Sequence, residues 1–186
     1  MRGLLLALCV WTSVGEAKKI ENVEFQDVVI VGSQRYVLNG VATRVKKKLG
    51  VNFKVYVAAL YLPAMSTDSE QIIGSPFPKI LELEFLREVD RETLQEAWTE
   101  AYEKNCGDDC LAAKGQLKAF NDLMVDVQQA SRIKISFERG SVNVDVKGSK
   151  SNSAMIVGEA FRRVVLAMFI GKNPPTPELK KGLLGL

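Results

Sequence analysis

The first half of the chain alternates apolar and polar residues with a period of two, which is typical of β-strands. In KILELEF, residues 79–85, the leucines and the phenylalanine fall on one face and Glu82 and Glu84 on the other. This pattern indicates a strand with one solvated side. Three earlier segments that are rich in apolar residues and separated by short polar connections also indicate strands. We therefore predict strands at 23–31, 34–46, 51–63 and 79–85.

The second half of the chain begins with helical spacing. Asp90 is a suitable N-cap, and from Leu94 to Asn105 residues recur at i, i+3 and i+4 on one face. Residues 107–109 interrupt this pattern, and residues 110–127 resume it. We predict two helices that meet at a tight corner.

A hairpin and further helices complete the predicted elements. Residues 132–148 alternate on both sides of a central Gly-Ser turn, as two antiparallel strands do. We predict next a long helix that includes Met155 and Val157 and ends at Gly171, and a short last helix that Thr176 caps. The fold class is therefore α+β, with a mostly antiparallel sheet and helices on one face.

Arg44 and Tyr56 stand in strands that are otherwise almost wholly apolar. A buried guanidinium without a partner is costly, so an acidic group should meet Arg44: a ligand, or Glu82 or Glu84 of the protein, unless Arg44 faces solvent at an edge. The two residues share a face of the sheet only if an odd number of residues connects their strands, because a two-residue loop would place them on opposite faces. Residues 51–63 are apolar on both faces, so both should be covered. The helices are one cover, and a ligand is a candidate for the other.

The N-terminal MRGLLLALCVWTSVGEA, residues 1–17, differs from the rest of the chain. A basic start, a short apolar run and a small-residue exit are the features of a secretory signal peptide, and the run is too short for a stable bilayer span. We expect cleavage after Ala17, one domain at 18–186, a periplasmic or secreted location and no stable membrane span after cleavage. An uncleaved amphipathic start is the alternative.

Composition narrows the function classes further. The 186 residues are 47% hydrophobic and 25% charged, as in ordinary globular domains, with a net charge of +3. The basic cluster at residues 46–48 has no interleaved aromatic residue, which indicates a solvated hairpin tip and argues against a nucleic-acid partner. The chain has no histidine, which excludes Ser-His-Asp and Cys-His catalysis.

Two of the three cysteines lie in NCGDDC, residues 105–110. In an exported protein an even pair, here Cys106 and Cys110, predicts a disulfide, and this one would fix the corner between two predicted helices. A C-x-x-x-C pair can also bind metal, but a chain without histidine lacks further ligands of that kind for a structural zinc site, so we expect no metal.

Four segments resemble the chalcone isomerase-like family, and specifically its exported bacterial branch. They are GVATR (40–44), FKVYVAALYLP (53–63), WTEAYEKN (98–105) and AFRRVVLAMFIGKNPPTPELKKGLLG (160–185). The resemblance implies an open-faced β-sandwich, with a large antiparallel sheet, a helical layer on one face and a cleft between them. This expectation agrees with the α+β pattern.

The resemblance also bears on function, because plant enzymes of the family cyclise chalcones to flavanones, whereas related members bind fatty acids and the bacterial relatives are regarded as non-catalytic. Arg44 matches the family's strand arginine, and Asn105 its helix asparagine. Tyr56, Trp98 and Met168 replace the isomerases' strand threonine, helix tyrosine and last-helix Ser/Thr. Because Trp98 and Met168 cannot supply the hydroxyls that hold the reactive carbonyl and a water, the resemblance favours binding.

In the fatty-acid-binding members an arginine and a nearby tyrosine bind the carboxylate, and the resemblance gives this role to Arg44 and Tyr56. The tryptophan, methionine and phenylalanine of the helices are expected in the pocket wall, with the core as their alternative place. The asparagine is a polar group in the cleft or a cap at its helix end. The expected ligand-binding set is Arg44, Tyr56, Asn105, Trp98, Met168 and Phe169.

We therefore expect a monomeric periplasmic protein that binds a fatty acid or a similar amphipathic carboxylate and needs no cofactor. Two alternatives stay open. One is an isomerase-type intramolecular lyase on an unknown substrate, in which Arg44 stabilises a developing enolate or phenolate. The other is a protein–protein role in the cell envelope, in which Arg44 is structural.

Overall fold

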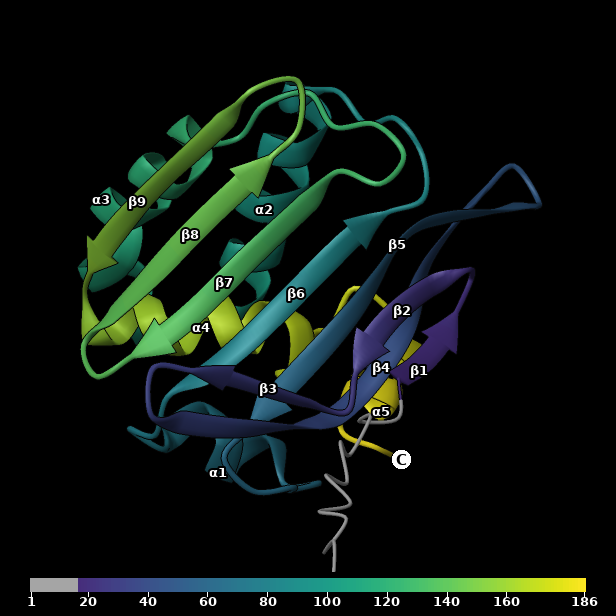
Figure 1. Cartoon of the computed structure of the whole chain (residues 1–186). Coiled ribbons are helices and arrows are strands. Elements are labelled where there is room, and N and C mark those ends of the chain that lie inside the picture. Colours follow the sequence, from purple (N-terminus) through teal and green to yellow (C-terminus); the bar gives the residue numbers. More distant parts are fainter. Residues whose placement is uncertain (1–16) are drawn as a thin grey trace, which may run out of the picture.

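A seven-stranded antiparallel sheet forms the centre of the protein (Figure 1). The computed structural model describes residues 17–186, and each strand of the sheet pairs with the next one along the chain. The predicted signal peptide lies outside the described residues, apart from Ala17. The strands are β3 (Val28–Val31), β4 (Gln34–Lys48), β5 (Val51–Leu62), β6 (Lys79–Phe85), β7 (Arg132–Glu138), β8 (Ser141–Lys147) and β9 (Ser151–Val157).

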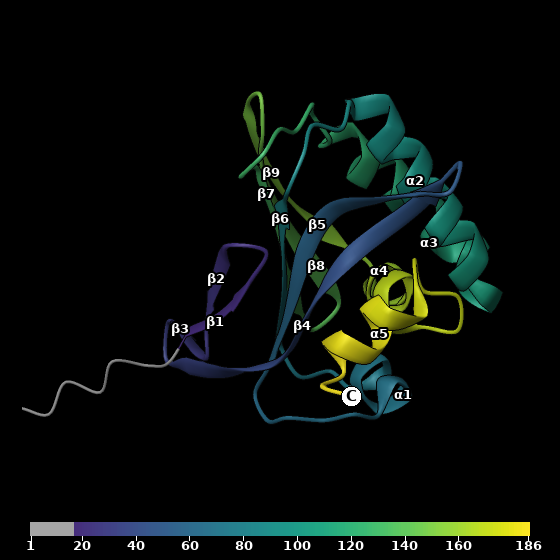
Figure 2. The ribbon, with the colours of Figure 1, turned by 90° about the vertical axis from the view of Figure 1, so that its right-hand side faces the viewer.

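The helices lie on one face of this sheet, as the side view in Figure 2 shows. Asp90 begins the longest of them by accepting a hydrogen bond from the Thr93 amide, as its sequence position predicts. Within residues 17–186 no helix has the length and apolar character needed to cross a membrane. The expected α+β class, with helices on one face of an antiparallel sheet, is confirmed. The helices are α1 (Ser69–Gly74), α2 (Arg91–Asn105), α3 (Cys110–Asp122), α4 (Glu159–Ile170) and α5 (Pro177–Leu183), with a 3-10 turn at Gly107–Asp109.

The main core lies between the sheet and α2, α3 and α4. Trp98, Phe120, Phe161 and Phe169 are buried there, and the ring centroids of neighbouring pairs are 5.6 to 6.0 Å apart. Burying one such side chain stabilises a protein by about 2 kcal/mol. This aromatic cluster therefore holds α2 and α3 against α4.

A two-stranded hairpin, β1 (Ala17–Ile20) and β2 (Val23–Gln26), covers part of the opposite face of the sheet. Val23 and Phe25 pack there on the side of β5 that carries Val57, Ala59 and Tyr61, and they form a second, smaller core. The hairpin is thus the second cover of β5, in the place where the sequence left room for a ligand.

Three predicted elements have different bounds in the structure. Residues 23–31 form two strands, β2 and β3, which belong to different sheets. Met155 and Val157 were predicted in a helix, but they lie in β9, and α4 starts only after Gly158. Both side chains are exposed on a strand that pairs only with β8, so their apolar character does not mark a helix face. The second predicted helix is shorter, because α3 ends at Asp122.

Two glycines allow α5 to lie directly on β4. A Cβ atom on Gly40 would collide with the carbonyl oxygen of Gly182, and one on Gly182 would collide with Ala42. A bulge in β4 also places Asn39 so that its side chain donates to the carbonyl of Leu183 at 2.9 Å. These contacts fix α5, and with it the loop that enters α5 from α4.

Candidate functional site

A pocket of about 360 Å³ opens between the β4–β5 hairpin, α2 and the loop that joins α4 to α5. Three residues predicted from the sequence, Arg44, Tyr56 and Trp98, line it together. Its volume lies near the lower end of the roughly 300–1,000 Å³ that small-molecule sites span. The apolar part of its wall consists of Val55, Phe85, Val89, Leu94, Ala97, Trp98, Ala101, Pro174 and Pro175.

Arg44 and Tyr56 are direct partners across the β4–β5 ladder, and they share the face that lies toward the helices. The turn between the strands has two residues, Leu49 and Gly50, which alone would place the pair on opposite faces. A bulge at Val55 supplies the missing step, because β5 has one residue more than β4 beside this pair. The prediction that only an odd-numbered loop could bring them together was therefore wrong.

Neither Arg44 nor Tyr56 has a polar partner among residues 17–186. The hydroxyl of Tyr56 is buried without a hydrogen bond, and the residue is only 3% exposed. Arg44 forms no ion pair with a described side chain. Because a buried hydroxyl without a partner costs about 1–3 kcal/mol, the pocket holds an interaction that the chain itself does not complete.

The protonation state of Tyr56 suits an acidic ligand. Burial raises the pKa of the Tyr56 phenol well above its usual value of 10.0, and the nearby Arg44 guanidinium offsets only part of this rise. The phenol therefore stays protonated and can donate a hydrogen bond. An edge contact with Phe85, with ring centroids 5.6 Å apart, holds its ring. A guanidinium fork beside a phenol donor is an arrangement that fits a carboxylate.

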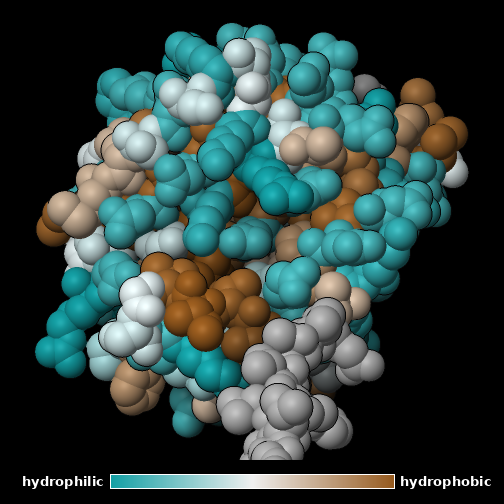
Figure 3. Space-filling view, in the orientation of Figure 1, coloured by the Kyte–Doolittle hydropathy of each residue, from teal (hydrophilic) through white to brown (hydrophobic). Residues whose placement is uncertain are grey.

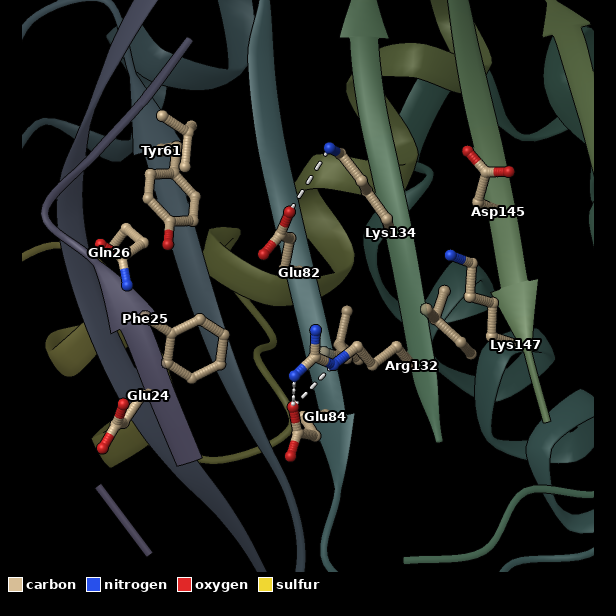
Figure 4. Close-up of a pocket in the computed structure, with 13 residues that line it drawn as sticks. Glu24, Phe25, Gln26, Tyr61, Glu82, Glu84, Arg132, Lys134, Asp145 and Lys147 are labelled. Carbon is tan, nitrogen blue, oxygen red and sulfur yellow. Dashed lines mark hydrogen bonds and ion pairs between the residues drawn. The ribbon is translucent and has the colours of Figure 1, made fainter. Parts of the chain in front are cut away.

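The acidic residues that the sequence offered as partners of Arg44 lie on the other face of the sheet (Figure 4). Glu82 pairs with Lys134 at 3.5 Å, and Glu84 pairs with Arg132 at 2.6 Å, each across β6 and β7. An ion pair of Arg44 with Glu82 or Glu84 was therefore a wrong alternative.

These ion pairs belong to a larger depression of about 580 Å³ under the β1–β2 hairpin, which we call the charged hollow. Figure 4 shows its floor of acidic and basic side chains on β6, β7 and β8, with Phe25 and Tyr61 at one side. The hollow includes Glu82, Glu84, Arg132, Lys134, Asp145 and Lys147.

Charged side chains also line the pocket, and basic ones outnumber acidic ones there. Glu100 of α2 binds Lys104 one turn later, and this hydrogen bond is the main reason why the pKa of Glu100 is lowered; Lys46 and Arg44 add to the effect. Glu100 is thus already bound by a lysine. With Glu96, the lining holds two acidic and three basic residues, so its net charge attracts an acidic ligand.

Asn105 supports the pocket without lining it. Its side-chain NH₂ donates to the carbonyls of Ala101 and Asn173, both at 2.9 Å, and its side-chain oxygen accepts from the Asn173 amide at 3.0 Å. This is the helix-end position that the sequence left open for it, and it leaves no side-chain hydrogen free for a ligand. The bonds instead hold Pro174 and Pro175 at the pocket wall.

Of the apolar residues predicted at the site, Trp98 lies in the pocket wall, whereas Met168 and Phe169 lie behind it. Met168 is 1% exposed, and Phe169, at 0%, packs on Trp98 with ring centroids 5.6 Å apart. The indole N–H of Trp98 donates to the sulfur of Met124 at 3.2 Å, so it is not free for a ligand. For Met168 and Phe169 the structure agrees with the core alternative.

Cys106 and Cys110 form the predicted disulfide, with their Cα atoms 4.8 Å apart. It joins the end of α2 to the start of α3, and the hydroxyl of Tyr102 donates to the carbonyl of Cys110 at the same corner. The end of α2 that carries Lys104 and Asn105 is therefore fixed relative to α3.

Several pocket residues were not predicted from the sequence. Phe85 and Val89 come from the end of β6 and the segment after it, and Pro174 and Pro175 from the loop before α5. The available signal was the stretch IGKNPPTPELK, residues 170–180, which carries the family resemblance but does not by itself indicate a pocket wall.

Comparisons with known proteins identify a family and a solved structure that this chain resembles. The profile of a family described as chalcone isomerase-like matches residues 17–185. Among solved structures, a fatty-acid binding protein of Arabidopsis thaliana superposes with a TM-score of 0.71 at 18% sequence identity, over 91% of this chain and 96% of the plant chain. No curated protein sequence matches. At this level of identity the structural likeness shows a shared fold.

Proposed function

Because the chain belongs to the chalcone isomerase-like family, we propose that it binds a fatty acid or a similar amphipathic carboxylate in the pocket between the β4–β5 hairpin and α2. The observation that carries the proposal is the buried Tyr56 hydroxyl beside the Arg44 guanidinium, neither of which has a hydrogen-bonding or ion-pair partner among the described side chains. The Arabidopsis protein of the same fold, named as a fatty-acid binding protein, supports the ligand class.

The chemistry of the proposed complex follows from the lining of the pocket. The carboxylate accepts hydrogen bonds from Arg44 and Tyr56, and a hydrogen bond to a charged group contributes about 1.5–3 kcal/mol. The alkyl chain lies on the apolar wall, where each buried methylene contributes about 0.8 kcal/mol. Because Trp98 and the core behind it close one side, a longer chain leaves through the mouth of the pocket.

The isomerase alternative has less support from the same residues. Of the three positions at which the isomerases carry hydroxyls, Tyr56 alone presents one to this pocket. The Trp98 N–H is bound to Met124, and Met168 lies in the core. Ligand binding requires only the groups that the pocket contains.

We also place the protein, as part of the proposal, in the periplasm or outside the cell. The pattern of residues 1–17 supports export, and the Cys106–Cys110 disulfide is of a kind that persists in oxidising compartments. Cleavage after Ala17 would give a mature chain that starts at Lys18.

Native mass spectrometry of the purified protein, followed by denaturation and lipid analysis, tests the proposal. We expect a co-purifying carboxylate, or binding of added dodecanoate where the natural ligand is lost. Arg44→Ala should weaken dodecanoate binding by on the order of hundredfold, the loss of about two charge-assisted hydrogen bonds, with little change in fold stability. The mass of the chain also reports whether residues 1–17 have been removed.

Arg132→Ala is the matched control, because it removes a cation from the opposite face of the sheet. It should bind dodecanoate as the parent does. If Arg44→Ala retains the parent affinity, the carboxylate site is elsewhere. A parent protein that carries no ligand and takes up no added fatty acid would refute the binding function itself.

A further inference from the structure

The tip of the β4–β5 hairpin projects beyond the rest of the sheet (Figure 1) and ends in apolar side chains. Leu49 is 95% exposed, and Val51 is 54% exposed. Figure 3 shows apolar, brown atoms at the upper right of the molecule, where Figure 1 places the tip, with polar atoms next to them. Nothing in the described chain covers these side chains.

Leu49 is unfavourable at the tip for a second reason, which concerns the backbone. Its φ angle is +49° and that of Gly50 is +79°, so both residues of the two-residue turn are in the left-handed region. Such turns favour Asn-Gly or Asp-Gly, and a bulky side chain with positive φ is an outlier. A leucine here is disfavoured by hydration and by backbone conformation, so folding does not account for it.

Positive charge surrounds this apolar tip. Residues 44–54 include five basic residues and no acidic one. Lys46 and Lys47 are exposed and form no ion pair with a described side chain. Lys54 is paired with Glu21 at 2.8 Å, on the side of the hairpin away from the helices. The tip therefore combines insertable apolar atoms with free cations directly behind them.

We propose that this hairpin docks the protein on an anionic lipid bilayer, with Leu49 and Val51 in the interface and the lysines at the level of the headgroups. An apolar edge followed by basic side chains matches the sequence of layers in such a membrane: acyl chains first, then negative phosphates. A flat acidic protein surface would satisfy the lysines but would leave the leucine in water.

The docking surface continues into the pocket, and this step rests on the proposed function. Lys46 pairs with Phe53 on the helix-facing side of the hairpin, next to the Arg44–Tyr56 pair, and Lys46 also lines the pocket. A carboxylate that leaves the bilayer at the tip therefore meets Lys46 before it reaches Arg44. The hairpin is both anchor and entry path for a ligand that resides in membranes.

Co-sedimentation with vesicles tests the docking, using the full chain without added ligand. The parent should bind vesicles of equal parts phosphatidylglycerol and phosphatidylcholine more tightly than vesicles of phosphatidylcholine alone. Leu49→Asn should weaken binding about tenfold or more. Asparagine suits the turn better than leucine, so this variant should fold at least as well as the parent. Lys47→Gln, which does not touch the pocket lining, should weaken binding about fivefold on the anionic vesicles only.

Leu111→Asn is the matched control, because Leu111 is 89% exposed on α3, away from the hairpin. All variants have the same N-terminus, whether or not residues 1–17 have been removed, so differences between them report the exchanged side chain. Docking is overturned if Leu49→Asn binds the anionic vesicles as the parent does, if Leu111→Asn loses as much affinity, or if the parent ignores the vesicles. Dodecanoate binding without vesicles separates the two proposals: Leu49→Asn should leave it unchanged, whereas Arg44→Ala should weaken it by on the order of hundredfold.

Discussion

The two faces of the sheet carry two depressions that differ in what their charges do. The charged hollow is the larger of the two, at about 580 Å³, and two of its three basic residues, Arg132 and Lys134, are paired with Glu84 and Glu82 on the neighbouring strand. The pocket is smaller, at about 360 Å³, and its Arg44 stands opposite a tyrosine, which cannot neutralise it. Size and the number of charged residues favour the hollow, but the buried hydroxyl without a hydrogen bond, that of Tyr56, lies in the pocket.

The difference arises from the strand register. On β6 and β7, acidic and basic residues fall directly opposite each other, so folding completes their interactions. On β4 and β5, the bulge at Val55 places a cation beside a phenol instead. The two buried tyrosines show the same contrast. Burial raises the pKa of both, but Arg44 acts on Tyr56, whereas the carboxylates of Glu82 and Asp27 act on Tyr61 and would repel an acid.

Among the tests of this contrast between the two faces, we expect the largest change in dodecanoate affinity from Tyr56→Phe. Without the hydroxyl, dodecanoate binding should weaken roughly tenfold to hundredfold, because a hydrogen bond to a charged carboxylate is lost. The ligand-free protein should become more stable by about 1 kcal/mol, since the buried unpaired oxygen is gone. Calorimetric titration measures the affinity, and thermal unfolding should show a rise in Tm of about 2–4 °C.

Tyr61→Phe is the control for the expected loss of affinity and gain of stability, because Tyr61 is also a buried tyrosine but lines the charged hollow. It should leave dodecanoate affinity at the parent value. A Tyr56→Phe protein that loses stability, or that binds dodecanoate as well as the parent, would show that the Tyr56 hydroxyl is an ordinary core group.

A smaller effect concerns pH. Because burial raises the pKa of Tyr56 above 10.0, its phenol remains a donor, and dodecanoate affinity should stay constant from neutral pH up to pH 10.0. On the acid side the ligand itself loses its charge: below the pKa of a simple carboxylic acid, about 4.3, affinity should fall about tenfold per pH unit. Dodecanoate titrations across this pH range measure the constant affinity up to pH 10.0 and the fall in acid. Tyr56→Phe is the control, because it has no phenol at residue 56 whose ionisation could lower the affinity at high pH. A loss that begins below pH 10.0 in the parent would contradict a raised pKa.

Much of the fold could be predicted from the sequence, because burial on one face of a strand or helix imposes a period. The strands β6, β7 and β8 and the helix α2 were predicted for this reason, whereas α5 was predicted from the Thr176 cap at its start. β9 was not, since it lies at an edge and exposes Met155 and Val157. Apolar residues that face solvent have no period that reveals their partner, and here they were assigned to the helix that follows.

The site could be predicted from the sequence only where a single residue is unusual in its own segment. Arg44 in an apolar strand indicated an acidic partner, but the face that it shares with Tyr56 depends on a bulge at Val55, which has no sequence signature. Pro174 and Pro175 reach the wall through contacts of Asn105 with Asn173 that span 68 residues of chain, and no local pattern encodes such contacts.

The smallest expected effect concerns the stability contributed by the Glu84–Arg132 ion pair of the charged hollow. Glu84→Gln should reduce the free energy of unfolding by at most about 1 kcal/mol, because Arg132 is largely exposed in this ion pair and water screens it. The loss should shrink at high ionic strength. Urea unfolding at low and high salt measures both values. Arg44→Ala in the ligand-free protein is the counterpart and should cost nothing, since no described side chain pairs with Arg44. If instead Arg44→Ala destabilises the protein more than Glu84→Gln does, Arg44 is the structural charge, and the roles of the two faces are reversed.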